Sequence, residues 1–216
     1  MRDLLSALPR PDDAVETLGP GATLLHGFAR DEAPALMEAV AAIAAAAPFR
    51  RMVTPGGFTM SVAMTNCGAA GWVTDRKGYR YTAEDPEAGR PWPPIPTVFL
   101  SLAARAAVAG GYRGFVPDAC LVNRYEPGTR LSLHQDRNER DAAAPIVSVS
   151  LGLPATFLWG GDSRGDRPRR IRLESGDIAV WGGPTRLNFH GVDVIADGED
   201  GLTGRYRYNL TFRKAL

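Results

Sequence analysis

Short segments in which apolar and polar residues alternate fill the second half of the chain, and they constrain the fold more than any other feature. Eight such segments follow one another between turn residues, at 119–125, 131–136, 146–152, 155–159, 169–174, 177–181, 187–193 and 205–212. Alternation with a period of two is typical of strands that bury one face. Eight strands of this length fit a double-stranded β-helix, or jelly roll, in which two sheets enclose one core.

The first half of the chain differs, because its pattern favours helices that would support one sheet of the jelly roll. Asp31 has the residue type of a helix N-cap and precedes an alanine-rich stretch, 32–47, which a proline ends. A second helix is expected over 97–109, before two glycines. A short strand is expected at 23–25, and residues 1–20 are expected to form a loosely held extension. The predicted fold class is mainly β with supporting helices (α+β).

The length and composition of the chain fit a single unit. With 216 residues, of which 44% are hydrophobic, it can bury one large core. We expect two parts within that unit: residues 1–115 with the helical extension, and residues 116–216 with the jelly-roll core. No run of 18 apolar residues and no basic-then-apolar leader occurs, so neither a membrane span nor a signal peptide is indicated. Cys67 and Cys120 are expected to be free packing residues of a cytoplasmic protein.

Two histidines and an aspartate have a spacing that suits metal binding. His134 and Asp136 form an H-x-D triplet, and His190 is one of only two other histidines in the chain. On a strand, His134 and Asp136 point the same way and can reach one ion, while Gln135 faces away. Two imidazoles and one carboxylate form the facial triad that holds iron(II) and leaves its other positions free. A triplet this short also arises by chance, and His190 alone fits packing as well as metal binding.

The last predicted strand carries two arginines on one face. Alternation places Arg207, Asn209, Thr211 and Arg213 on one side, and Tyr206, Tyr208, Leu210 and Phe212 on the other. Because a buried guanidinium without an anionic partner is destabilising, the arginines indicate a ligand such as a dicarboxylate. Asn123 and Tyr125 share a face of segment 119–125 and can donate hydrogen bonds to the same ligand. Together with the triad, these residues indicate an oxygenase that uses iron(II) and 2-oxoglutarate.

Five uninterrupted blocks carry a more specific resemblance. They are MVTPGGFTMSVAMTNCG (52–68), PDACLVNRY (117–125), LSLHQD (131–136), PIVSVSLGLP (145–154) and RYNLTFR (207–213). In these blocks the chain resembles the AlkB family of iron(II)- and 2-oxoglutarate-dependent oxygenases, which dealkylate DNA and RNA. The likeness extends from about residue 21 to residue 213. It implies a jelly-roll core and the cofactors iron(II), 2-oxoglutarate and O2.

The resemblance also implies roles for individual residues. The iron would be held by His134, Asp136 and His190. We expect Arg213 to pair with the distal carboxylate of 2-oxoglutarate, because arginine binds carboxylates in a bidentate manner. Arg207 is expected nearer to the carboxylate at the metal. The rest of this cofactor site would be formed by Asn123, Tyr125 and Asn209.

The stretch 49–96, in the first part of the chain, is rich in glycine, proline and aromatic residues that stand among basic ones. Such a mixture is used to stack unpaired bases, although a lid whose aromatic residues belong to the core fits the same pattern. The resemblance implies a nucleotide-recognition lid, in which Trp72 stacks the damaged base against His134 and Tyr79 contacts the substrate backbone. The other residues expected along the substrate groove are Thr54, Tyr81, Leu131, Gln135, Asn138 and Arg164.

The activity implied by the resemblance is oxidative demethylation of 1-methyladenine and 3-methylcytosine in DNA, with single-stranded DNA and RNA as further substrates. Formaldehyde, succinate and CO2 would be released, and the enzyme would be a monomer. Asn138 departs from the family pattern, which has an aspartate there. Asparagine retains hydrogen bonding to the base but lacks the charge that attracts a cationic lesion, so the lesion preference stays open. Phe58 replaces a tyrosine of the family.

The charge of the chain excludes a polycation that coats nucleic acid. The net charge is +1, from 25 Lys plus Arg and 24 Asp plus Glu, so binding needs a local patch. Candidate patches are Arg50 with Arg51, Arg76 and Lys77 with Arg80, and the arginine-rich run 164–172, although each also fits a solvated surface. Two other classes stay open: an oxygenase of the same cofactor class with a small-molecule or protein substrate, and a metal-binding jelly roll without enzymatic activity. The paired arginines argue against the last.

Overall fold

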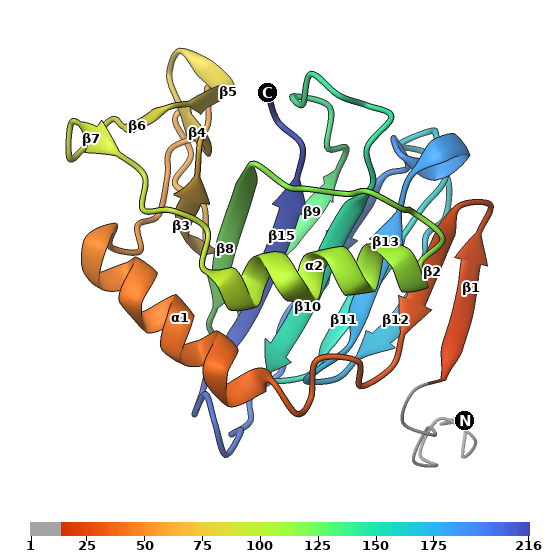
Figure 1. The fold of residues 1–216 in the computed structure, drawn as a ribbon. Coiled ribbons are helices and arrows are strands. Elements are labelled where there is room, and N and C mark those ends of the chain that lie inside the picture. The colour runs from red at the N-terminus through yellow and green to blue at the C-terminus, as the bar shows by residue number, and fades with distance from the viewer. Residues whose placement is uncertain (1–13) are drawn as a thin grey trace.

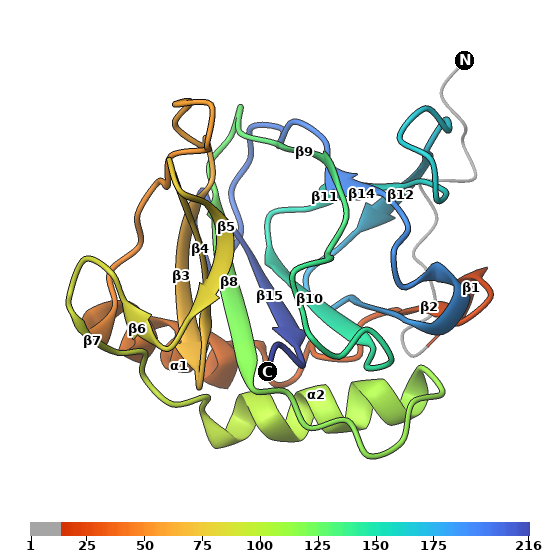
Figure 2. The ribbon, with the colours of Figure 1, turned by 90° about the horizontal axis from the view of Figure 1, so that it is seen from above.

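Two antiparallel sheets face each other in the computed structural model, which describes residues 14–216, and two helices cover the outside of the larger sheet (Figure 1). The larger sheet has the strand order β1-β2-β13-β10-β15-β8-β3, and the smaller sheet has the order β12-β11-β14-β9. Seen from above, the smaller sheet lies on one side of β10 and β15, and α2 lies on the other (Figure 2). The predicted fold class, mainly β with supporting helices in a jelly-roll arrangement, is confirmed.

The elements of the two sheets and their helices have the following bounds. The larger sheet consists of β1 (Val15–Gly19), β2 (Ala22–Leu25), β3 (Ala63–Gly68), β8 (Ala119–Tyr125), β10 (Ile146–Gly152), β13 (Ile178–Trp181) and β15 (Arg207–Arg213). The smaller sheet consists of β9 (Leu131–His134), β11 (Ala155–Trp159), β12 (Arg169–Leu173) and β14 (His190–Val192). The helices are α1 (Ala33–Ala46), α2 (Thr97–Ala109) and the short 3-10 helix η2 (Gly183–Thr185).

The helices bury their apolar faces against the outer face of the larger sheet. Leu36 and Ile43 of α1 and Phe99 of α2 belong to one core cluster with Leu210 and Phe212 of β15. The rings of Phe99 and Phe212 meet edge to face, with centroids 5.6 Å apart. The apolar face predicted for the last strand therefore lies under the helices. Its polar face is left for the space between the two sheets.

The predicted helix over 97–109 is confirmed, whereas the start of the first helix is not as expected. Glu32, not Asp31, occupies the N-cap position of α1, and no side chain hydrogen-bonds there. Pro34 lies in the first turn, where its fixed φ favours the start of a helix without a side-chain cap. The prediction of Asp31 as the N-cap is therefore wrong.

Most of the predicted strands are present, with shorter ends. β8, β10 and β11 have the predicted bounds, but β9 ends before Asp136, and β14 covers only 190–192 of the predicted 187–193. Residues 15–19, expected in a loose extension, form β1 and pair with β2. That pairing depends on a partner strand, which the local pattern does not reveal. The rest of the predicted extension, residues 1–13, lies outside the described residues.

The stretch 49–96 is only partly a lid. β3 belongs to the larger sheet and pairs with β8, so that Cys67 lies opposite Cys120; both cysteines are buried and free. β4 (Gly71–Asp75) and β5 (Gly78–Thr82) form a separate hairpin, and β6 (Glu84–Asp85) and β7 (Arg90–Pro91) form another. Because β1, β2 and β3 join strands from after residue 116 in one sheet, both predicted parts of the chain build the core. The division at residue 115 stays a prediction. Within residues 14–216, neither helix is long and apolar enough to cross a membrane.

Trp92 and Arg50 fasten the base of this stretch to the sheets. Trp92 is 4% exposed, so the alternative that the aromatic residues belong to the core holds for this one. Arg50 places its guanidinium 5.2 Å from the Trp92 ring centroid and its Nη2 atom 2.6 Å from Oδ1 of Asp85. Burial raises the pKa of the Asp85 carboxyl, but the hydrogen bond and the charge of Arg50 outweigh burial, so this pKa lies below its ordinary value.

We expect Asp85→Asn to lower the free energy of unfolding by about 2 kcal/mol at neutral pH, because it removes a charged partner from a buried arginine. Since the pKa of Asp85 is lower in the folded protein, its contribution is complete above the pKa of an unfolded aspartate. It is lost as the pH falls through the folded pKa. Urea unfolding between pH 7 and pH 3.5 measures this difference. Glu87→Gln is the matched control: Glu87 also pairs with Arg50, at 3.2 Å, but its side chain is 70% exposed. An equal loss at both ends of the pH range would contradict the prediction.

Candidate active site

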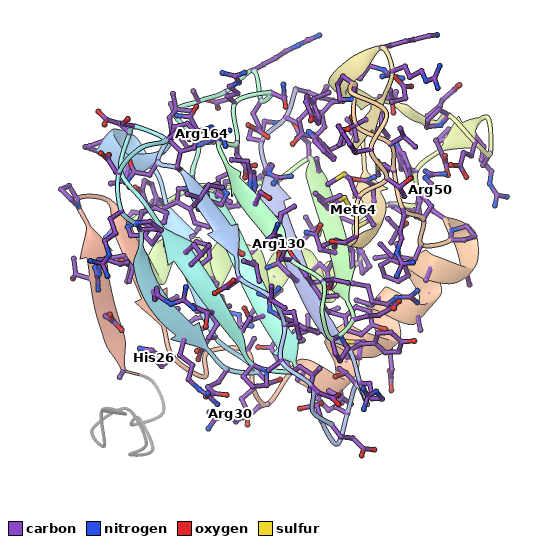
Figure 3. The ribbon with its side chains drawn as sticks, turned by 180° about the vertical axis from the view of Figure 1, so that it is seen from behind. His26, Arg30, Arg50, Met64, Arg130 and Arg164 are labelled. Carbon is purple, nitrogen blue, oxygen red and sulfur yellow. The ribbon has the colours of Figure 1, made fainter. Side chains whose placement is uncertain are left out.

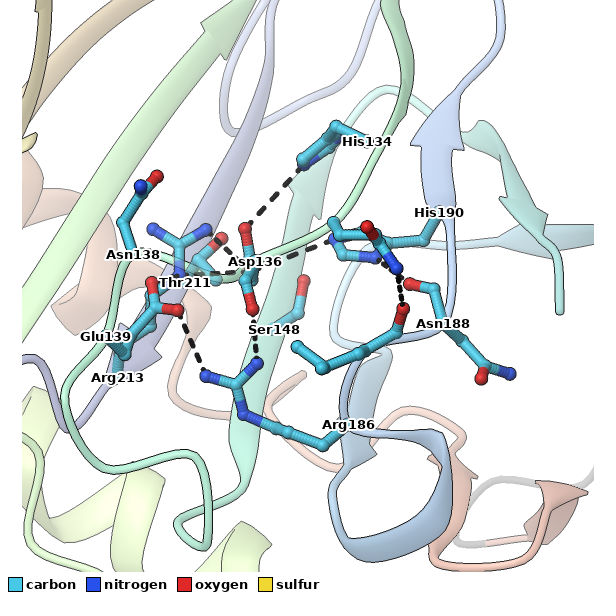
Figure 4. Close-up of polar contacts among 12 residues, drawn as sticks. His134, Asp136, Asn138, Glu139, Ser148, Arg186, Asn188, His190, Thr211 and Arg213 are labelled. Atoms are coloured by element: carbon cyan, nitrogen blue, oxygen red, sulfur yellow. Dashed lines mark hydrogen bonds and ion pairs between the residues drawn. The ribbon is translucent and has the colours of Figure 1, made fainter. Parts of the chain in front are cut away.

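Donor atoms of three side chains converge between the two sheets. His134 ends β9, Asp136 follows it, and His190 begins β14, where it is the cross-strand partner of His134. Asp136 Oδ1 lies 3.8 Å from His134 Nε2, and Asp136 Oδ2 lies 3.8 Å from His190 Nε2 (Figure 4). One donor atom from each residue lies within 4.8 Å of the others, a spacing that fits one shared ion. The structure brings together the three residues that the sequence predicts as metal ligands.

Backbone carbonyls orient both imidazoles. The Nδ1 atom of His134 lies 2.9 Å from the Ser132 carbonyl oxygen, and that of His190 lies 3.0 Å from the Asn188 carbonyl oxygen. Because a carbonyl only accepts, we assign the proton to Nδ1, which leaves the Nε2 lone pair facing the triad. Burial, and then the charge of His134, lowers the pKa of His190 to about 4. His190 is therefore neutral near pH 7, which is the form that binds a metal.

Asp136 is held as a carboxylate by a buried arginine. Arg213 donates from Nε and Nη2 to Asp136 Oδ2, at 3.0 and 2.8 Å. Burial raises the pKa of Asp136, but the charge of Arg213 and then those of the two histidines outweigh burial, so this pKa lies far below its ordinary value. Arg213, rather than Arg207, contacts a residue of the triad, and which carboxylate of 2-oxoglutarate each arginine binds stays a prediction.

Arg207 lies six residues earlier on β15 and lacks an anionic partner among the described residues. It is 1% exposed, donates from Nη2 to Ser150 Oγ at 3.1 Å, and lies 4.9 Å from the Tyr125 ring centroid. Its Nε and Nη1 atoms are buried and have no hydrogen-bond partner within residues 14–216. Unsatisfied donors on a buried cation indicate that an anionic ligand completes the site.

A network of amides and hydroxyls lies beside Arg207. Asn209 donates from Nδ2 to Ser148 Oγ at 2.8 Å and to the Val149 carbonyl at 3.0 Å, and its Oδ1 accepts from Thr211 and Asn123. These bonds fix the inner face of β15 against β10 and β8. Asn123 Oδ1 is buried and has no partner among the described residues, so it is available to a ligand. The unsatisfied donors of Arg207 beside this network fit 2-oxoglutarate, whose carboxylate and keto oxygens accept hydrogen bonds, whereas Asn123 Oδ1 is itself an acceptor and does not pair with them.

A cavity of about 1060 Å³ joins the triad, the arginines and the hairpin of β4 and β5. It is lined by all but one of the predicted site residues: Thr54, Trp72, Tyr79, Asn123, Tyr125, Leu131, His134, Gln135, Asp136, Asn138, Arg164, His190, Arg207, Asn209 and Arg213. The exception is Tyr81, whose hydroxyl donates to Glu139 Oε1 at 2.6 Å. The space is large enough for a small dicarboxylate together with a second ligand.

The hairpin of β4 and β5 contacts the segment that follows Asp136. The indole Nε1 of Trp72 donates to Asn138 Oδ1 at 3.3 Å. The Trp72 ring stacks on Tyr79 with centroids 5.7 Å apart and an interplanar angle of 21°. Tyr79 is 49% exposed, so an aromatic surface remains at the mouth of the cavity. We call the stretch 71–82 the lid from here on.

The rim of the cavity is ordered by contacts to the backbone. Thr54 Oγ1 accepts from the Phe58 amide at 3.2 Å, in a turn whose Phe58 ring is 77% exposed. Gln135 lines the cavity, and its Nε2 donates to the Leu187 carbonyl at 2.7 Å. Arg164 donates to the Leu133 carbonyl at 2.9 Å. Three of the predicted groove residues thus stabilise the rim through hydrogen bonds to backbone groups: Thr54, Gln135 and Arg164.

Ion pairs neutralise much of the candidate basic patches. Arg50 pairs with Asp85, Arg51 with Glu126, Arg80 with Asp75, Arg169 with Glu16, and Arg170 with Asp193. In the run 164–172, Arg164 lines the cavity, whereas Arg169 and Arg170 form exposed ion pairs. The solvated-surface interpretation therefore fits Arg169 and Arg170.

Two buried residues of the site are not among the predicted site residues. Arg186 donates to the Asp136 carbonyl and to Glu139, and no motif surrounds it that would indicate this. Trp181 ends β13; the sequence predicts it at the core or rim of the barrel, near the metal side, where it could touch the cofactor. Its ring meets that of His190 at 4.9 Å and forms the wall behind this histidine.

The comparisons with known proteins agree with this geometry. Residues 21–213 match the model of the 2OG-Fe(II) oxygenase superfamily, so the protein is an enzyme of this class, with iron(II), 2-oxoglutarate and O2 as cofactors. The chain is 56% identical over 200 residues to the alpha-ketoglutarate-dependent dioxygenase AlkB of Salmonella typhimurium, and 55% identical to that of Escherichia coli; each match covers 93% of both chains. The chain therefore belongs to the AlkB family.

Solved structures lead to the same fold. The structure titled "The structure of OsALKBH1" matches with a TM-score of 0.82 at 30% identity, covering 93% of this chain and 100% of the other. A 2OG-Fe(II) oxygenase family protein from Burkholderia pseudomallei, at 16% identity, shares the fold with a TM-score of 0.54.

We expect His190→Gln to weaken cobalt(II) binding to the metal-free protein at least about 100-fold, because it removes one of three ligands. Titration followed by cobalt absorption or by calorimetry measures the affinity. The control is His26→Gln, since His26 pairs with Glu16 at 3.3 Å and lies at the other end of the strands from Arg164 (Figure 3). Equal cobalt affinity of the two variants would contradict the assignment of the triad.

Proposed function

We propose that the protein demethylates 1-methyladenine and 3-methylcytosine in DNA, and that single-stranded DNA and RNA are also substrates. The observation that carries this proposal is the shared cavity, in which the metal triad and the two arginines lie beneath an aromatic lid. The names of relatives support a nucleic-acid substrate. Besides the two AlkB proteins, they include the tRNA demethylase abh1 of Schizosaccharomyces pombe, 30% identical over 66% of this chain and 52% of its own length, and the DNA N(6)-methyladenine demethylase ALKBH1D of Arabidopsis thaliana, 41% identical over 45% of this chain and 24% of its own length.

Iron(II) and 2-oxoglutarate supply the oxidation when bound: one oxygen atom of O2 hydroxylates the N-methyl group, the other enters succinate as 2-oxoglutarate loses CO2, and the hydroxymethyl group leaves as formaldehyde. The contribution of the protein is to position the metal, 2-oxoglutarate and the methylated base. His134, Asp136 and His190 would hold the metal, and all three residues line the cavity. Arg213 keeps Asp136 ionised and its carboxylate aligned.

The two arginines have different tasks in this proposal. Arg207, with two unsatisfied donors, binds the distal carboxylate of 2-oxoglutarate, which reverses the order expected from the sequence. Tyr125 would support the Arg207 guanidinium, while Asn123 and Asn209 would complete the cofactor site beside it. Arg213 lies beside the triad and stabilises the carboxylate that binds at the metal. The two arginines on the inner face of β15 would thus determine the orientation of bound 2-oxoglutarate.

Base recognition is assigned to the mouth of the cavity. A methylated base of this type is cationic, so the faces of Trp72 and Tyr79 attract it. Exposed aromatic residues such as Phe58 can stack on neighbouring bases, and a single strand is favoured because an unpaired base is exposed at a smaller energetic cost. Asn138 accepts a hydrogen bond but carries no negative charge, so the enzyme favours cationic over neutral lesions less strongly than it would with an aspartate there.

We further propose that the enzyme acts as a monomer in the cytoplasm, because one chain builds the whole cavity and its two cysteines are free.

The proposed activity predicts that the protein releases formaldehyde from an oligonucleotide containing 3-methylcytosine, in the presence of iron(II), 2-oxoglutarate and ascorbate. His134→Ala abolishes the release, because the metal loses a ligand. Formaldehyde detection and mass spectrometry of the oligonucleotide measure the reaction, with the unmethylated oligonucleotide as the control. Succinate formation that is equal with and without the methylated base would contradict a role in demethylation.

Arg207→Met separates the stability of the protein from its affinity for 2-oxoglutarate. We expect the ligand-free variant to be at least as stable as the wild type, because a buried cation without an anionic partner is replaced by an apolar side chain of similar length. Its affinity for 2-oxoglutarate falls about 100-fold. Thermal unfolding with and without 2-oxoglutarate measures both effects. The control is Arg170→Met, which changes an exposed arginine on β12. Equal stabilisation of variant and wild type by 2-oxoglutarate would contradict the assignment.

A further inference from the structure

The metal ligand Asp136 lies in a segment without regular secondary structure. β9 ends at His134 and β10 begins at Ile146, so residues 135–145 connect the two sheets without a strand ladder. We call this segment the connector. Asp136 is nevertheless only 7% exposed. Its position therefore depends on side-chain contacts to the connector rather than on backbone pairing in a sheet.

One guanidinium group contacts the connector at three points. Arg186 donates from Nη1 to the Asp136 carbonyl at 2.6 Å and from Nη2 to Glu139 Oε2 at 3.1 Å (Figure 4). Its Nε atom donates to the Ala144 carbonyl at 3.1 Å. Arg186 is 4% exposed, and it lies between η2 and His190. It therefore connects the segment that carries one metal ligand with the segment that leads to another.

Arg186 also balances the buried charges beside the triad. The Glu139 side chain is 2% exposed, and Arg213 Nε lies 3.5 Å from its Oε1 atom but 3.0 Å from Asp136 Oδ2. Two guanidinium groups thus serve two buried carboxylates. Without Arg186, Arg213 alone would face both carboxylates, and a buried anion without a partner is strongly destabilising. Arg213 would then turn from Asp136 towards Glu139.

The same part of the connector receives the lid. Glu139 accepts the hydroxyl of Tyr81, and Asn138 accepts the indole N–H of Trp72. Trp72 and Tyr81 are opposite each other in the pairing of β4 and β5. Two consecutive connector residues therefore hold both strands of the lid. Arg186, which contacts Glu139 from the other side, fixes the place where the lid closes.

We propose that Arg186 is a positioning residue that couples closure of the lid to the alignment of Asp136 at the metal. This inference rests on the proposed function in one respect, because closure of the lid has a role only if the cavity binds a substrate. Its consequences for metal binding and for lid opening are measured without any nucleic acid. A negative demethylation assay would therefore not contradict the role of Arg186, and a negative result for Arg186 would not contradict demethylation.

The main test is Arg186→Met, which keeps an apolar side chain in place of the buried stem. Cobalt(II) affinity of the metal-free variant falls by about 10- to 100-fold, as expected when a residue that orients a metal ligand is lost. Hydrogen exchange of amides 71–82 becomes faster, and urea unfolding stays cooperative. Arg186→Lys recovers only part of both effects, because an ammonium group does not reproduce the planar contacts to three acceptors. Tyr81→Phe speeds lid exchange and weakens cobalt binding less than Arg186→Met does, because it removes one lid contact but leaves the contact between Arg186 and the Asp136 carbonyl.

A double variant distinguishes positioning from a general loss of folding. In Arg186→Met with Glu139→Gln, Arg213 no longer faces a second carboxylate, so cobalt affinity returns to within about fivefold of the wild type. A residue that only stabilised the fold would give no such recovery. Unchanged cobalt affinity or unchanged lid exchange in Arg186→Met would overturn the proposal. If that variant does not fold, Arg186→Lys carries the test: weakened cobalt binding together with faster lid exchange supports the proposal, and a wild-type value of either quantity overturns it.

Discussion

The ion pair between Arg213 and Asp136 connects every functional part of this molecule. Arg213 belongs to the larger sheet, and Asp136 follows a strand of the smaller sheet, so their contact joins the two sheets at the metal site. The pair also keeps Asp136 ionised in a buried position. A neutral carboxyl there would be a poor metal ligand, and an unpaired carboxylate would destabilise the fold. Stability and metal binding therefore depend on the same contact.

The strand β15 separates the structural side of the protein from its chemical side. Leu210 and Phe212 point to the helices, and Arg207 and Arg213 point to the cavity. Because a one-residue shift would exchange these faces, the register of β15 against β10 and β8 is strongly determined. The polar face is tolerated in the interior because hydroxyls, amides and Asp136 satisfy most of its donors. We propose that the co-substrate satisfies the donors of Arg207 that remain without a partner among the described residues.

Charge at the surface and charge in the site have separate roles. The arginines of the candidate patches mostly pair with nearby acids, in agreement with the net charge of +1. In the proposed function, substrate binding would therefore depend more on the exposed rings of Tyr79 and Phe58 at the cavity mouth than on a broad basic surface. The buried charges around Asp136 and Glu139 are closely balanced instead. In such a setting, loss of a single guanidinium affects several groups together.

Local pattern was enough to predict the strands β8, β10 and β11, the helix α2 and the face on which each residue of β15 lies, because alternation and helix stops are encoded by neighbouring residues. The H-x-D triplet with His190 and the resemblance to the AlkB family also identified the metal ligands. What the sequence determined by itself was therefore the set of elements and the residues that could meet. Tertiary structure alone decided that β1 and β3 complete the larger sheet, that Arg213 rather than Arg207 contacts Asp136, and that Arg186 holds the connector. These contacts join residues up to 77 positions apart, and their geometry arises only when the two sheets close on each other.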